Sequence, residues 1–72
     1  MSAPLQLLDV VALTVDIPEI GLVRGQVGTV VETLGLDVFE VEFSDEAGRT
    51  YALLPLAAEQ LLGLYYEPVE AA

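Results

Sequence analysis

The chain has 72 residues, which is room for one domain with one hydrophobic core. It contains twelve Asp and Glu residues against two Arg (Arg24 and Arg49), for a net charge of −10, and it has no His, Cys or Lys. These absences exclude disulfides, thiolate metal sites and nucleophilic catalysis of the Ser–His, Cys and Lys types. The acidic charge disfavours direct DNA or RNA binding, because it repels phosphates, and it favours association with a basic protein.

Hydrophobic residues make up 54% of the chain, against about 45–50% in typical soluble domains. A domain this small has difficulty burying so much apolar surface, so we expect an exposed apolar patch or a surface for self-association. No basic residue precedes the first apolar run, and Asp9 interrupts that run. We therefore expect neither a signal peptide nor a membrane span, and we expect a cytoplasmic protein.

The first half of the chain predicts two strands joined by a loop. Residues 8–14 are rich in Val and Leu and predict the first strand, and Pro18 interrupts strand pairing because it lacks a donor. Residues 20–24 then predict a loop. The second strand, over residues 26–34, is mostly β-branched and contains Gly28, which indicates a bulge or a close approach of two backbones.

Residues 35–37 predict a turn, and residues 38–44 predict the third strand. Its residues alternate between apolar and acidic, which is typical of a half-buried antiparallel strand. The expected inward residues are Phe39, Val41 and Phe43, and the expected outward residues are Glu40 and Glu42.

Residues 45–48 predict a hairpin closed by a type I turn and a glycine bulge, because Gly48 tolerates positive φ. The fourth strand, over residues 49–54, is expected to stop at Pro55. Residues 56–60 predict one short helical turn, and residues 61–66 predict the fifth strand.

Five short strands separated by turns predict an all-β fold, and closure is an economical solution for so small a sheet. We expect a small five-stranded SH3-like barrel with one short helical turn before the last strand. Residues 1–72 should form this single domain, ordered over about residues 5–67, with a frayed C-terminal tail. The alternative is an open meander that completes its core by dimerising.

Four segments resemble a bacterial family called domain of unknown function 4926. They are Leu7–Leu13, Gly21–Glu32, Phe39–Asp45 and Gly48–Ala52. The resemblance implies no activity and no catalytic residue. More loosely, Gly25–Val31 resembles the glycine–valine segment of KOW-type SH3-like modules, which implies the fold, and in those modules often RNA or protein contacts.

The remaining chemistry is that of carboxylates. Glu40 and Glu42 should lie roughly 7 Å apart on one strand face, a separation that inverting glycosidases use. Asp45 and Glu46 are oxygen ligands of the kind that calcium or magnesium prefers. We interpret the first pair as a solvated strand face and the second as a hairpin, and we expect no catalytic residue, no metal and no cofactor.

We therefore predict a non-enzymatic module that binds a protein partner, as an accessory subunit or an antitoxin-like inhibitor. The expected contacts are Pro18, Leu22 and Arg24 in one loop, and Tyr66 near the C-terminus. Two alternatives stay open, a KOW-like nucleic-acid-associated module and a self-assembling structural protein.

Overall fold

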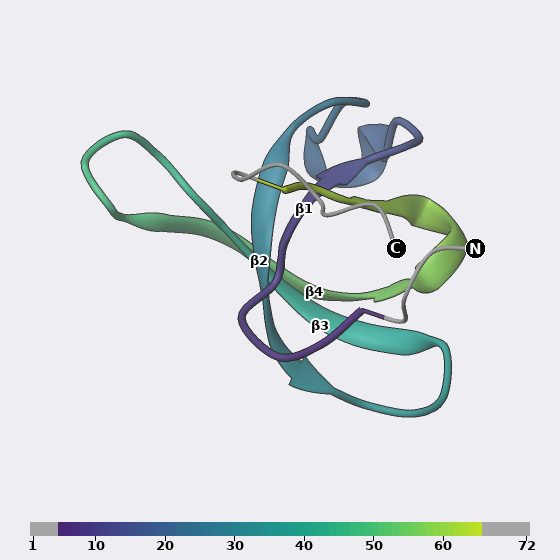
Figure 1. The fold of residues 1–72 in the computed structure, drawn as a ribbon. Helices are drawn as coiled ribbons and strands as arrows, with labels where there is room; N and C mark the ends of the chain where they lie inside the picture. The colour runs from purple at the N-terminus through teal and green to yellow at the C-terminus, as the bar shows by residue number, and fades with distance from the viewer. Residues whose placement is uncertain (1–4, 66–72) are drawn as a thin grey trace.

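The computed structural model describes residues 5–65, which form one antiparallel sheet of five strands (Figure 1). The strands are β1 (Val10–Leu13), β2 (Val27–Thr33), β3 (Val38–Ser44), β4 (Thr50–Ala57) and β5 (Leu61–Gly63). Two short 3-10 turns join them, η1 (Pro18–Ile20) between β1 and β2, and η2 (Ala58–Gln60) between β4 and β5. The predicted all-β class and the five strands are confirmed.

The strands lie in the order β4-β3-β2-β1-β5. Figure 1 shows that the sheet is strongly curved, that η2 carries the chain from β4 round to β5, and that the β3–β4 hairpin projects away from the rest. No hydrogen bonds join β4 to β5 within residues 5–65, so both are edge strands. The closed barrel therefore stays a prediction. Within the same residues, no helix is long and apolar enough to span a membrane.

The core lies on one face of the curved sheet, and every strand contributes to it. Among residues 5–65, the buried residues of this core are Val11, Leu13, Leu22, Val30, Phe39, Val41, Phe43, Leu56 and Leu61. The predicted alternation of β3 is confirmed, since its three inward residues are all buried. Each fully buried side chain of this size contributes roughly 1.5–3 kcal/mol to folding. Because β3 supplies three of them, it is the centre of the core.

Gly28 marks a close approach of β2 to β3, which was one of the two predicted roles. A Cβ atom at Gly28 would lie 2.8 Å from the Glu42 carbonyl oxygen, 2.8 Å from Val41 Cγ1 and 2.9 Å from Phe43 Cδ2. The bulge of β2 lies farther along, where the register with β3 shifts between Val30 and Glu32.

The prediction that the fourth strand stops at Pro55 is wrong, because β4 continues to Ala57 and Pro55 lies opposite Glu40 on β3. Ala58 N–H donates to the Asp37 carbonyl, and alternation along the ladder then directs the nitrogen of Pro55 away from β3. An edge strand tolerates proline in that orientation. The longer strand reduces the predicted helical turn to the three residues of η2.

The bounds of β3 match the predicted ones, those of β1 and β2 differ by one or two residues, and β5 ends at Gly63, three residues before its predicted end. β1 begins at Val10, not at Leu8, because residues 6–9 form a turn in which Asp9 N–H donates to the Gln6 carbonyl at 3.1 Å. The predicted order up to residue 67 and the predicted frayed tail lie outside the described residues.

Candidate functional site

A shallow groove of about 340 Å³ lies between the loop that carries η1 and the outer edge of β4. We call it the β4 groove. It is lined by Ile20, Tyr51, Ala52, Leu53 and Leu54. Three of these are large apolar side chains that expose about half of their surface, 49% for Ile20, 48% for Tyr51 and 56% for Leu53. Two segments that are far apart in the sequence thus present apolar surface to solvent at one place.

The η1 loop holds Ile20 in its exposed position. Ile17 and Leu22 form two backbone hydrogen bonds across the base of the loop, at 2.8 and 3.1 Å. Gly21 adopts a left-handed conformation with φ of 72°, which reverses the chain at the end of η1. Leu22 is buried in the core and anchors the base. Ile20 therefore lies on a closed loop with an anchored base.

Tyr51 is held from two sides. Its ring packs against buried Phe43, with ring centroids 6.4 Å apart, and its hydroxyl accepts a hydrogen bond from Gln26 Nε2 at 3.2 Å. The other amide atom, Gln26 Oε1, accepts the N–H of Val23 at 2.6 Å. Gln26 thus connects the loop after η1 to β4, and both walls of the groove are positioned before any partner binds.

The backbone of β4 is open along the groove. Residues 52, 54 and 56 face the ladder with β3, as the Ala58–Asp37 hydrogen bond indicates by alternation. The backbone N–H and C=O of Leu53 and the C=O of Pro55 point the other way. Among the described residues, no backbone group pairs with them.

Carboxylates gather on the outer face of the sheet beside this edge. Glu42 lies opposite Leu53, and Glu40 lies opposite Pro55. On its other side, Glu40 lies opposite Glu32 of β2. Like charges directly opposite one another are unfavourable in a sheet, so this face would be stabilised by a cation.

The model described as "Domain of unknown function (DUF4926)" matches residues 7–62, which is most of the chain. The chain belongs to the DUF4926 family. The search of curated proteins found no match, and neither did the search of solved structures. The segment that this DUF4926 protein shares with its family includes every residue of the β4 groove.

The four predicted contact residues of this DUF4926 protein differ in exposure and position. Pro18 and Arg24 are exposed, and Pro18 begins η1 next to the groove. Leu22 is only 1% exposed, so the prediction that it contacts a partner is wrong, because its side chain is needed in the core. Tyr66 lies outside the described residues.

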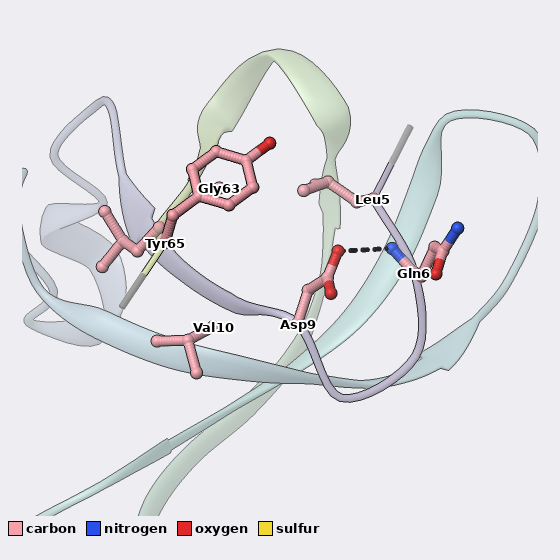
Figure 2. Close-up of a pocket in the computed structure, with 7 residues that line it drawn as sticks. Leu5, Gln6, Asp9, Val10, Gly63 and Tyr65 are labelled. Atoms are coloured by element: carbon pink, nitrogen blue, oxygen red, sulfur yellow. Dashed lines mark hydrogen bonds between the residues drawn. The ribbon is translucent and has the colours of Figure 1, made fainter. Parts of the chain in front are cut away.

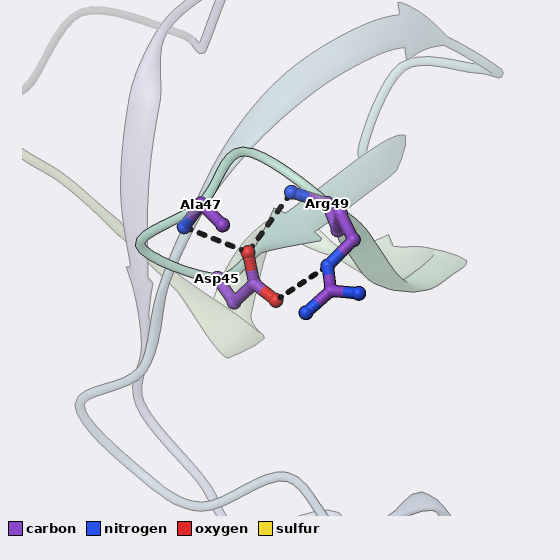
Figure 3. Close-up of polar contacts among 3 residues, drawn as sticks. All are labelled: Asp45, Ala47 and Arg49. Carbon is purple, nitrogen blue, oxygen red and sulfur yellow. Dashed lines mark hydrogen bonds and ion pairs between the residues drawn. The ribbon is translucent and has the colours of Figure 1, made fainter.

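The hairpin of the DUF4926 protein uses Asp45 for its own structure (Figure 3). Asp45 Oδ1 accepts the N–H groups of Ala47 and Arg49, both at 2.9 Å, and Oδ2 lies 3.6 Å from Arg49 Nε. Gly48 has φ of 83°, and its N–H donates to the Asp45 carbonyl, so the predicted turn is confirmed. No group of three or more potential ligands in residues 5–65 is placed to hold a metal ion.

A second pocket, of about 210 Å³, lies between the N-terminal turn and β5 (Figure 2). Leu5 and the ring of Tyr65 point toward one another across it, above Asp9. The carboxylate of Asp9 accepts the N–H of Gln6 at 2.8 Å and so closes its own turn. The carboxylate therefore has a local structural role, and we place the candidate site at the β4 groove.

Sequence analysis did not find Ile20 or Leu53. Every residue from Tyr51 to Leu56 is apolar, so no alternation separates the outward side chains from the inward ones. One signal in the sequence could have indicated an exposed edge here. The run is apolar on both faces of the strand and contains a proline, and a proline within a strand is typical of an edge strand.

Proposed function

We propose that this protein is a non-enzymatic interaction module that binds another protein through the β4 groove. The observation that carries the proposal is the exposure of Ile20, Tyr51 and Leu53 together beside an unpaired strand edge. Covering the exposed half of each side chain stabilises a complex by about 1 kcal/mol per residue. Aromatic and aliphatic anchors of this kind contribute much of the binding energy in protein interfaces.

The chemistry of the chain supports a binding role. It has no imidazole, thiol or amine side chain, and none of the residues that line the groove is a carboxylate. Its net charge of −10 favours a basic partner.

The strand order supports an SH3-like arrangement, which we propose for the fold. After β4, the turn η2 brings the chain back so that β5 pairs with β1. In this arrangement η2, and not a ladder, joins the two edge strands. The outer edge of β4 thereby stays available to a partner.

The test is affinity capture with the full chain from a lysate of the organism that encodes it, because we propose a cytoplasmic location. Ile20→Ser and Leu53→Ser each remove one wall of the groove. Leu36→Ser is the matched control, since Leu36 is 98% exposed and is not part of the groove. We expect the wild type and Leu36→Ser to retain the same protein and the two groove variants to lose it, with circular dichroism spectra unchanged.

Two results would contradict the proposal. One is capture that the groove variants leave unchanged. The other is a stable dimer of the protein alone, measured by light scattering, that Leu53→Ser dissociates. That dimer would show that a second copy covers the groove.

A further inference from the structure

We propose that the β4 groove takes an extended segment of its partner as an added strand, and that basic and apolar residues alternate in this segment. The inference rests on the proposed function and specifies the mode of binding and the chemistry of the partner. It combines three features of the described residues, which are the open backbone of β4, the apolar depression beside it and the carboxylates on the outer face.

The backbone of β4 offers three hydrogen-bonding groups to an added strand. Leu53 supplies one donor and one acceptor, and Pro55 supplies one acceptor. In an antiparallel pairing, the incoming residue opposite Leu53 exchanges both hydrogen bonds with it, and the residue opposite Pro55 donates one. Recognition of extended segments at a sheet edge relies on such bonds for affinity and on alternate side chains for specificity.

The side chain between those two incoming residues points to the inner face of the sheet. There it meets Ala52 and Leu54, which are half-buried, and Ile20 across the groove. Each of these contacts is apolar. The groove therefore fits a medium-sized apolar side chain, such as valine, at this position.

The two incoming residues that pair with β4 point to the outer face. Their near neighbours are Leu53 and Pro55, and the next row holds Glu42 and Glu40, two strand spacings or about 10 Å from the added backbone. A lysine or arginine can lay its methylene chain over the apolar neighbour and bring its charge to the carboxylate. A cation at Glu40 would also reduce the repulsion between Glu40 and Glu32, which lies opposite Glu40 one strand farther from the added backbone.

A second copy of the chain fits this edge poorly. Residues 50–57, which form β4, contain no basic residue and include Pro55, which has no N–H. Pairing β4 with its own copy would bring two chains of charge −10 together without supplying a cation. The charge and the proline thus favour a basic partner over self-pairing.

The test uses a fluorescein-labelled octapeptide of alternating lysine and valine, titrated with the full 72-residue protein and followed by fluorescence anisotropy. In the proposed geometry, the lysine N–H groups face β4 and the valine N–H groups face solvent. We therefore expect N-methylation of the lysines to weaken binding by at least about tenfold and N-methylation of the valines to change it by less than about threefold. The two modified peptides have the same charge and the same number of methyl groups, so non-specific attraction affects them equally.

The carboxylates are tested with Glu40→Gln and with Glu59→Gln as the control for net charge, since Glu59 is exposed in η2. We expect Glu40→Gln to weaken the lysine–valine peptide by about two- to fivefold more than Glu59→Gln. A peptide of alternating glutamate and valine should not bind. Equal binding of the two N-methylated peptides, or binding of the glutamate peptide, would overturn the inference.

The two proposals can fail separately. If lysate capture depends on Ile20 and Leu53 but the two N-methylated peptides bind alike, the protein is an interaction module and strand addition is wrong. If capture does not depend on these residues, the proposed function is wrong whatever the peptides do.

Discussion

Gly28 provides the sharpest test of the packing between β2 and β3, and we expect Gly28→Ala to destabilise the protein. A Cβ atom there would lie 2.8 Å from the Glu42 carbonyl oxygen and 2.8 Å from Val41 Cγ1. The first atom belongs to the backbone of β3, and the second belongs to a residue with no exposed surface. Neither atom can move without disturbing the sheet, so the substitution forces the strands apart.

The expected size of the effect follows from two opposing contributions. Inserting a methyl group into a packed core costs about 1–3 kcal/mol, and the two immobile contacts place Gly28→Ala near the upper end. Removing a glycine from the unfolded chain returns about 0.4–1 kcal/mol. The free energy of unfolding should therefore fall by about 2 kcal/mol, which corresponds to a Tm lower by about 8–16 °C for a domain of this size.

Urea unfolding followed by circular dichroism measures this difference, with Gly35→Ala as the matched control. Nothing lies within 4 Å of a Cβ atom at Gly35, and its φ is not positive, so its substitution should be neutral or slightly stabilising. We expect the midpoint of Gly28→Ala to fall by about 1–2 M. Equal midpoints for the two variants would refute the argument that Gly28 is required by close packing.

Three further predictions concern the β3–β4 hairpin. Gly48→Val should lower the free energy of unfolding by more than about 1 kcal/mol, because φ of 83° strains a β-branched residue. Gly48→Asn should lower it less, since asparagine tolerates positive φ better. Equal urea midpoints for the two variants would contradict the strain argument. Asp45→Ala should lower it by about 1 kcal/mol, because two backbone N–H groups lose their acceptor. Arg49→Met should lower it by less than about 0.5 kcal/mol in the same measurement, since the ion pair is exposed; a larger loss than for Asp45→Ala would assign the stability of the turn to that pair.

Local patterns in the sequence were enough to predict much of the fold. The alternation of β3 marks its inward face, because successive side chains of a strand point to opposite sides. The turn at Asp45 and Gly48 follows from a carboxylate that accepts local N–H groups and a glycine that tolerates positive φ. Each of these patterns reflects interactions between residues close together in the chain.

The candidate site depended on the tertiary structure. Leu22 and Ile20 are both apolar loop residues, and only the closed loop shows that the first is buried and the second exposed. A strand can continue through Pro55 only if the nitrogen of Pro55 points away from the neighbouring strand. The pairing of β4 with β3 decides this orientation. The sequence by itself thus determined an acidic, all-β domain with excess apolar surface. The order of the strands in the tertiary structure decided where that surface is exposed. The reason is that apolar residues on an edge strand lack a neighbouring strand to cover them.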